Sequence, residues 1–237
     1  PLRPVKAILD SVLSIDHRRT FPQYAGETFE HWFKKNAAES QQKYSQRVAY
    51  FHGCYVNYNN PELGKDLVRV MNALGFGVEL VEGEKCCGVA MIANGMSRQA
   101  RKHAENNVKA LERTSSKGLD IVTTSSTCVM TMRDEYPDLL KVDNSTIRDR
   151  LSLATKFIFA LIDSGKVRLA FKKGLKANMA YHTPCHLEKL GWGIFSTSLL
   201  NMIPGCSLTI LGSNCCGIAG TYGFKKENYN ASQAIGK

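Results

Sequence analysis

The chain contains the stretch Val78-Glu79-Leu80-Val81-Glu82-Gly83-Glu84-Lys85-Cys86-Cys87-Gly88, in which a short apolar run leads to two adjacent cysteines. Adjacent cysteines do not readily form a disulfide with each other, because an ordinary disulfide needs its two Cα atoms farther apart. Two adjacent thiolates can, however, both bind metal. The stretch therefore predicts a β-strand that leads into a pair of metal ligands.

The same triplet returns 129 positions later as Cys215-Cys216-Gly217. A further cysteine precedes each triplet at a similar distance: Cys54 lies 32 positions before Cys86, and Cys185 lies 30 positions before Cys215. A tyrosine stands four positions before each of these upstream cysteines. The sequence therefore predicts two copies of one cysteine-ligand unit.

The first unit, residues 46–140, alternates strands and helices. Apolar runs predict strands at 48–51, 78–81 and 121–124, and helices are expected at 61–74 and 97–113. This alternation is typical of a parallel sheet with helices on its faces, and ligands collect at the carboxyl ends of such strands. We therefore expect one edge of the sheet to gather four thiols, those of Cys54, Cys86, Cys87 and Cys128.

The second unit, residues 177–237, repeats part of this order. Strands are expected at 178–181 and 207–211, with a largely helical segment at 187–200 that is interrupted at Gly191-Trp192-Gly193. The counterpart of Cys128 would fall near position 257. We therefore expect the second unit to lack its last strand and closing cysteines within these 237 residues.

Two other segments complete the predicted α/β fold of two pseudo-repeated units. Residues 1–45 are expected to form a helical N-terminal segment, and residues 141–176 a connector with a helix at 145–162. Phe29, Trp32 and Phe33 form an aromatic stripe at helical spacing. The stripe either packs on a core or, helped by nearby lysines, lies on a membrane surface.

Composition narrows the possible functions. The formal net charge of +10 favours an acidic partner such as a membrane surface or another subunit. The basic residues are scattered and lack an aromatic–basic motif, so we expect no nucleic-acid binding. Eight cysteines are too few for a small secreted disulfide scaffold, and the longest apolar runs fall short of the ~18 residues of a membrane span. We expect a reducing compartment, with cysteines kept as thiolates.

The cysteine pattern leaves two kinds of metal centre open. Iron–sulfur clusters take thiolate ligands, and zinc takes four of them in a tetrahedron. Ser125 stands three positions before Cys128, where a Cys-x-x-Cys pair would have its first member. Cys206 lies outside the repeat and is expected to be a small buried residue beside a strand. The candidate metal ligands are Cys54, Cys86, Cys87, Cys128, Cys185, Cys215 and Cys216.

Histidines flank three of these cysteines. His52, His182 and His186 are candidates for ligands, for hydrogen-bond donors to sulfur or for proton carriers to a quinone; packing is the alternative. His103 is expected to be solvated. The chain has no Walker loop, no Gly-x-Gly-x-x-Gly motif and no Gly-x-Ser-x-Gly motif, so an organic cofactor is expected to belong to a partner.

The motifs resemble the CCG cysteine-rich domain family, which occurs in the B subunit of heterodisulfide reductase, in iron–sulfur subunits of glycolate oxidase and in some succinate dehydrogenase membrane subunits. The similarity extends more closely to the C subunits of anaerobic glycerol-3-phosphate dehydrogenases. It rests on four stretches: Ser125-Ser126-Thr127-Cys128, Arg133-Asp134-Glu135-Tyr136-Pro137, Tyr181-His182-Thr183-Pro184-Cys185-His186 and the run from Cys215 to Tyr229.

The resemblance implies an iron–sulfur electron-transfer subunit rather than a chain with catalytic residues of its own. In the family, a flavin subunit oxidises sn-glycerol 3-phosphate, and the C subunit, beside a second dehydrogenase subunit, passes electrons towards menaquinone. It attaches the complex to the inner face of the cytoplasmic membrane as a peripheral protein. Family members also carry an N-terminal ferredoxin-like domain, so we expect this sequence to be cut at both ends.

The resemblance also implies ligand sets. Related units bind non-cubane [4Fe–4S] clusters through five cysteines. In the first unit Ser125 replaces one of them, so a simpler cluster or zinc is a possibility there. Beside these ligand sets, His182, His186 and Trp192 are our candidates for the quinone side, and Trp192 also for a membrane contact. Trp192 would share an apolar face with Phe195, Leu199 and Leu200, for which core packing is the alternative. A zinc-bearing scaffold and a thiol–disulfide reductase of the heterodisulfide reductase type are the competing functions.

Overall fold

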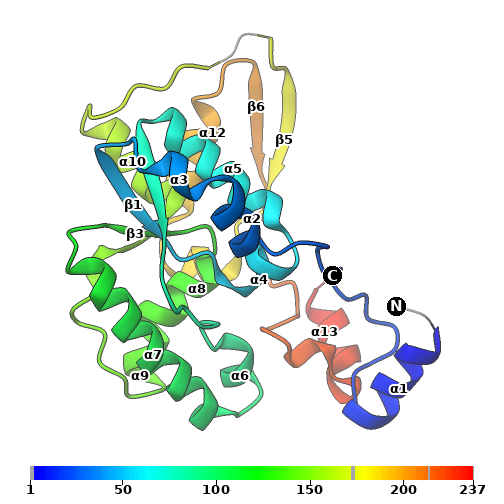
Figure 1. The fold of residues 1–237 in the computed structure, drawn as a ribbon. Helices are drawn as coiled ribbons and strands as arrows, with labels where there is room; N and C mark the ends of the chain where they lie inside the picture. The colour runs from blue at the N-terminus through cyan, green and yellow to red at the C-terminus, as the bar shows by residue number, and fades with distance from the viewer. Residues whose placement is uncertain (1–2, 172–173, 213, 237) are drawn as a thin grey trace.

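The computed structural model describes residues 3–171, 174–212 and 214–236 and has the predicted α/β fold (Figure 1). Its first sheet has the strand order β2-β1-β3-β4, and neighbouring strands pair in parallel. Its second sheet consists of β5 and β6, also parallel. The strands are β1 (Gln46–Tyr50), β2 (Phe76–Leu80), β3 (Ile121–Thr123), β4 (Leu151–Leu153), β5 (Ala177–Tyr181) and β6 (Cys206–Ile210).

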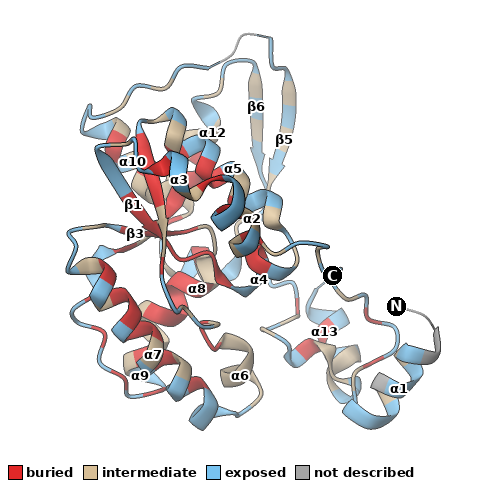
Figure 2. Cartoon of the chain, viewed as in Figure 1, coloured by how far each residue is buried: buried red, intermediate tan, exposed pale blue. Residues whose placement is uncertain are grey.

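Alternation of side chains along β1 divides the core of the first unit into two layers. Val48 and Tyr50 pack in one cluster, while Ala49 and Phe51 pack in the other. This period of two is what a strand buried on both faces requires. Figure 2 shows the buried residues concentrated in the strands and in the helix faces turned towards them.

Helices cover both faces of this sheet. The cluster around Phe51 includes residues of α7 (Ser97–Ser115), and the cluster around Tyr50 includes residues of α2 (Phe29–Asn36), α5 (Pro61–Ala73) and α10 (Ala154–Asp163). Shorter helices complete the unit: α3 (Ala38–Gln41), α4 (Gly53–Tyr58), α6 (Val89–Ala93), α8 (Ser126–Met130) and α9 (Tyr136–Asp138), with a π-helical turn at Thr131–Glu135.

The aromatic stripe of α2 belongs to the core. Phe29 is fully buried and meets the Tyr50 ring edge-on at 5.6 Å between centroids. Phe33 is also buried, and Trp32 stacks on Phe29. The packing interpretation is therefore confirmed for this stripe. Among the residues that the structure describes, no helix is long and apolar enough to span a membrane.

The expected helix at 145–162 is wrong in its first half. Residues 148–150 form a 3-10 turn, and Leu151–Leu153 form β4, which pairs with β3. Leu151 and Leu153 are buried while Ser152 between them is half-buried, so the local period is that of a strand. The helix α10 begins only at Ala154. A three-residue strand is too short for its period to stand out from the helical pattern that follows it.

The second unit packs α11 (Cys185–Lys189) and α12 (Gly193–Asn201) beside its two strands, with the predicted interruption at Gly191-Trp192. Two 3-10 turns at 222–224 and 226–228 then lead to α13 (Tyr229–Ile235). Residues near the N-terminus lie against this last part. Ile15 forms an antiparallel bridge with Lys225, and Figure 1 shows α1 (Arg3–Leu13) close to α13, away from the first sheet.

Candidate metal centre

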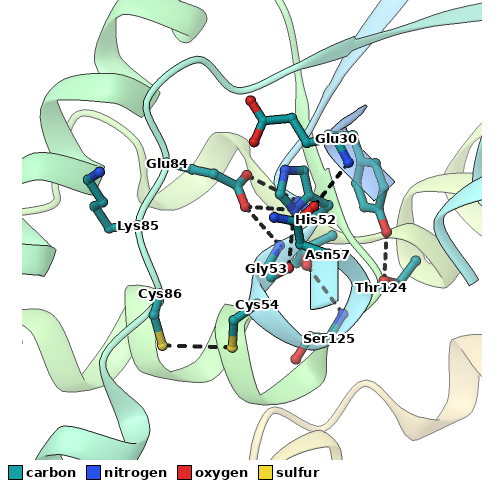
Figure 3. A network of polar contacts seen from close by, with 12 residues as sticks. Glu30, His52, Gly53, Cys54, Asn57, Glu84, Lys85, Cys86, Thr124 and Ser125 are labelled. Carbon is teal, nitrogen blue, oxygen red and sulfur yellow. Dashed lines mark hydrogen bonds and ion pairs between the residues drawn. The ribbon is translucent and has the colours of Figure 1, made fainter. Parts of the chain in front are cut away.

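Three loops at the carboxyl edge of the first sheet carry four cysteines. Cys54 lies in the first turn of α4 after β1, Cys86 and Cys87 lie in the loop after β2, and Cys128 lies in α8 after β3. Figure 3 shows Cys54 and Cys86 facing each other, with their sulfurs 3.9 Å apart. The predicted convergence is therefore present, although the strands that supply the residues are far apart in sequence.

The four sulfurs form a continuous row of thiol hydrogen bonds. Bonds from Cys54 and Cys87 lower the pKa of Cys86, and the bond from Cys87 lowers the pKa of Cys128. Cys54 and Cys87 donate these hydrogen bonds, and the same bonds raise their own pKa values. The shared hydrogen bonds therefore favour deprotonation of Cys86 and Cys128 over that of Cys54 and Cys87. Cys87 and Cys128 are buried, while Cys54 is exposed.

The glycine of each triplet has a specific backbone role. Gly88 and Gly217 have φ of +94° and +74°, in the left-handed region that glycine occupies at no steric cost. The backbone N–H of Gly88 donates to Cys86, and that of Gly217 donates to the Cys215 sulfur at 3.4 Å. A Cβ at Gly217 would also lie 2.1 Å from the Ser232 carbonyl oxygen. Each glycine therefore supplies an N–H to the first sulfur of its pair.

A buried carboxyl group fixes the loop that carries Cys54. Glu84 accepts hydrogen bonds from the backbone N–H groups of His52 (3.2 Å) and Gly53 (2.9 Å), and its carboxylate lies 3.0 Å from His52 Nδ1 (Figure 3). Burial raises the pKa of Glu84 and lowers the pKa of His52. Glu84 ties the β2 loop to the start of α4, a role that the sequence analysis missed.

Asn107 holds the loop that carries Cys86. Its side chain accepts from the backbone N–H of Lys85 at 2.7 Å and donates to the carbonyl oxygen of Lys85 at 3.0 Å and to the Tyr136 hydroxyl at 3.0 Å. Asn107 is fully buried on α7. An asparagine on the apolar face formed with Ala100, Ala104 and Leu111 was the signal that could have indicated this role.

His103 and Ser125 each hydrogen-bond to the backbone of a segment that carries a cysteine. His103 is half-buried, and its Nδ1 lies 3.1 Å from the Cys86 carbonyl oxygen, so the expectation of a solvated side chain is wrong. Since a carbonyl oxygen only accepts, Nδ1 carries the proton in this bond. Ser125 caps α8, its hydroxyl accepting from the backbone N–H of Cys128 at 3.2 Å. Serine at this position stabilises the helix that presents Cys128.

The second set of cysteines gathers from two loops. Cys185 begins α11 after β5, and Cys215 and Cys216 follow β6. Partial burial, together with the nearby Cys215 and Cys216, raises the pKa of Cys185. His182 Nε2 donates to the Asn214 carbonyl oxygen at 2.9 Å and thereby holds this loop. All three cysteines are exposed, whereas Cys206 lies in β6 and is half-buried, outside the set as expected.

Contacts between the two units bring the two sets close to each other. Thr127 Oγ1 and His186 Nδ1 lie 2.8 Å apart, and these residues are direct chain neighbours of Cys128 and Cys185. Asn94 donates to Thr221 at 2.6 Å, which joins the segments that follow the two triplets. Burial lowers the pKa of His186, which favours its neutral form.

Trp192 lies between the units rather than on the surface. It is 9% exposed and packs with Val129, Leu153 and Leu187. The Lys156 ammonium lies 3.9 Å from the centroid of the indole ring. The packing alternative therefore describes the position of Trp192, while a role towards quinone stays a prediction.

The first cysteine set offers donors for a metal centre. Within the described part of the chain, no three Cys, His, Asp or Glu side chains surround one point closely enough to be ligands of a single metal ion. The four cysteines of the row are free, and thiolates are ligands both of iron–sulfur clusters and of zinc. A cavity of about 580 Å³ adjoins Cys54 and Cys86 and provides space beside the row.

The family model described as "Cysteine-rich domain" (CCG) matches residues 48–133 and 179–237, the segments that contain both cysteine sets. The chain belongs to the CCG cysteine-rich domain family. Both matched segments begin within or beside the strand that leads to the first cysteine of a unit. The two structural units therefore correspond to the two parts of the family match.

Three known proteins are similar to this chain over most of its length. Over 99% of its length the chain is 53% identical to the C subunit of anaerobic glycerol-3-phosphate dehydrogenase of Escherichia coli, and it spans 59% of that protein. It is 30% identical to the B subunit of fumarate reductase (CoM/CoB) of Methanothermobacter marburgensis, covering 90% of this chain and 40% of that one. An uncharacterized iron–sulfur protein of Methanocaldococcus jannaschii is 28% identical, covering 81% of this chain and 36% of the relative.

Replacing Asn107 tests whether the Cys86 loop depends on its amide. Asn107→Ala leaves the Lys85 N–H and the buried Tyr136 hydroxyl without their partner, so we expect a loss of about 2–3 kcal/mol in the free energy of unfolding. Urea unfolding of the reduced, metal-free protein measures it. The matched control is Asn106→Ala, which removes one exposed hydrogen bond to the Gly83 carbonyl oxygen and is expected to cost less than about 1 kcal/mol. Equal losses of unfolding free energy in Asn107→Ala and Asn106→Ala would contradict the role of Asn107 in holding the Cys86 loop.

Proposed function

We propose that this protein is an iron–sulfur electron-transfer subunit of an anaerobic glycerol-3-phosphate dehydrogenase complex. The observation that carries the proposal is the convergence of free cysteines at the carboxyl ends of parallel strands, in a chain with high identity to the C subunit of such an enzyme. An iron–sulfur cluster supplies one-electron transfer when it is bound. The oxidation of glycerol 3-phosphate would take place at a flavin on another subunit.

The chain's own residues would hold and tune two clusters. Cys54, Cys86, Cys87 and Cys128 would hold the first, and Cys185, Cys215 and Cys216 would contribute to the second, a non-cubane [4Fe–4S] cluster in the whole protein. N–H donors to ligand sulfurs raise a cluster's reduction potential, and Gly88 and Gly217 are placed to do so. Burial of Cys87 and Cys128 would exclude water from one side of the first cluster.

The proposal also covers where the complex lies in the cell and which molecule accepts its electrons. We place the complex at the cytoplasmic face of the inner membrane as a peripheral assembly with menaquinone as acceptor. The net charge of +10 supports attraction to an anionic membrane surface. His182 and His186 flank the second cysteine set and are the candidates for the quinone side, with Trp192 packed next to them.

Metal and sulfide analysis of anaerobically purified protein tests the proposed function. We expect iron and acid-labile sulfide in similar amounts, and a large loss of both in the variant Cys86→Ser/Cys87→Ser, because two first-unit ligands are removed. The matched control is Cys206→Ala, since Cys206 lies in β6 and outside both sets. Its iron content should equal that of the unchanged protein. Zinc without iron or sulfide would contradict the proposal and favour a zinc-bearing scaffold.

Quinone reduction by the assembled complex tests the proposed electron acceptor and the proposed membrane attachment. We expect the assembled complex in anionic vesicles to reduce a menaquinone analogue with glycerol 3-phosphate as donor. High salt should release the complex from the vesicles, because screening weakens a surface held by charge. A complex that reduces soluble dyes but no quinone would contradict the acceptor assignment. Turnover of a disulfide by the isolated protein would favour the thiol–disulfide reductase instead.

A further inference from the structure

An N-terminal arm, residues 14–21, is fastened to the segment that follows Cys215-Cys216-Gly217. The backbone N–H of Asp16 donates to the Phe224 carbonyl oxygen at 2.9 Å, and that of Lys226 donates to the Ser14 carbonyl oxygen at 2.8 Å. The rings of Phe21 and Phe224 lie 5.5 Å apart. The arm is thus in contact with the surroundings of the second cysteine set, although about 200 residues separate them in sequence.

Two cations of this region, Arg18 and Lys226, have a carboxylate partner. Arg18 forms two hydrogen bonds with Asp16, at 2.8 and 2.6 Å, and its guanidinium lies 3.6 Å from the centre of the Tyr229 ring. Lys226 pairs with Asp10 at 2.5 Å. The charges of Arg18 and Lys226 are therefore offset locally.

Arg19 differs from both of these cations. It is 8% exposed, and its Nε is buried without a hydrogen-bond partner. Its Nη2 donates to the Ser232 hydroxyl at 2.5 Å, and Tyr229 and Phe224 rings lie over the guanidinium. Within the part of the chain that the structure describes, no carboxylate lies within ion-pair distance of Arg19. A buried guanidinium is costly unless an anionic group balances its charge.

Ser232 connects Arg19 to the second triplet. Its hydroxyl donates to the Gly217 carbonyl oxygen at 2.6 Å, and α13 lies so close that a Cβ on Gly217 would clash with the Ser232 backbone. Two hydrogen bonds in series therefore link the guanidinium to the Gly217 carbonyl oxygen, one residue after Cys216. In the first unit the corresponding contact of Gly88 is with Ala100, whose side chain has no polar group. The cation is a feature of the second set.

We propose that Arg19 is the charge partner of the second cysteine set, holding the Cys215–Gly217 loop through Ser232 and balancing the negative charge of its thiolates. The inference rests on the proposed function, in which these sulfurs act as anionic ligands. Arg19 is a positioning residue, since it touches no sulfur. A cation near a cluster favours the more negative, reduced form, so we expect Arg19 to raise the reduction potential of the second cluster.

The test measures the local positive potential with the reduced, metal-free, full chain. Each cysteine is alkylated in separate reactions with neutral iodoacetamide and anionic iodoacetate at low ionic strength, and its rates are read by peptide mass spectrometry. The ratio of the iodoacetate rate to the iodoacetamide rate reports the field at that sulfur. Changes in exposure or in thiolate content cancel from the ratio, because they affect both reagents.

Arg19→Gln keeps a donor for Ser232 and removes the charge, while Arg19→Lys keeps the charge. We expect Arg19→Gln to lower the ratio at Cys215 and Cys216 about threefold. Arg19→Lys should preserve the ratio, and Cys54 in the same chain should be unaffected in both variants. In the unchanged protein, added salt should lower the ratio at Cys215 and Cys216, which provides a measurement independent of any variant.

An unchanged ratio at Cys215 and Cys216 in Arg19→Gln, or an equal fall at Cys54, would overturn the inference. A fall in Arg19→Lys as large as in Arg19→Gln would show a structural effect and would also overturn it. The proposed function fails separately, through the absence of iron and sulfide from the unchanged protein. The two failures are therefore distinguishable, because the alkylation ratios need no bound metal.

Discussion

The parallel pairing of β1 with β2 is the interaction on which the first cysteine set depends. It aligns Tyr50 with Leu80, so the chain leaves both strands at the same edge of the sheet. Cys54 and Cys86 then lie 3.9 Å apart although 32 positions separate them. The β5–β6 pair aligns Tyr181 with Ile210 in the same way, ahead of Cys185 and Cys215. A parallel pair thus converts a spacing in sequence into adjacent ligands.

The two units use this principle with different surroundings. The first buries Cys87 and Cys128 and supports its loops with the buried Glu84–His52 pair and with Asn107. The second leaves its cysteines exposed and places a buried cation behind the loop. The Thr127–His186 contact joins residues that flank a cysteine of each set. The geometry therefore suits two centres of unequal environment that are held at a fixed separation.

Sequence patterns predicted the features that repeat along the chain. The α/β class, five of the six strands and the gathering of four thiols follow from apolar periodicity and from the rule that parallel strands present ligands at their carboxyl ends. The strand β4 was not predicted, because three residues directly followed by a helix show too little periodicity. The roles of Glu84, Asn107 and Arg19 were not predicted for another reason. Each acts through a hydrogen bond to a distant segment, which a single sequence does not reveal.

Hydrogen bonds in the structure also changed the interpretation of two side chains, those of Ser125 and His103. Ser125 marks the place of an absent thiol in the sequence, but in the structure its hydroxyl caps α8. His103 belongs to a charged, polar helix, yet it contacts the Cys86 carbonyl oxygen. Both residues hydrogen-bond to the backbone of a segment that presents a cysteine. The cysteine loops are therefore supported by polar contacts from neighbouring helices as much as by the sheet.

Iron K-edge X-ray absorption of the anaerobically purified protein tests the central claim most directly, because it reports the atoms around iron without requiring activity. The account predicts a first shell made of sulfur alone, together with scattering from neighbouring iron atoms. An oxygen- and nitrogen-rich first shell without iron–iron scattering would contradict it, since the converging thiols would then not hold a cluster.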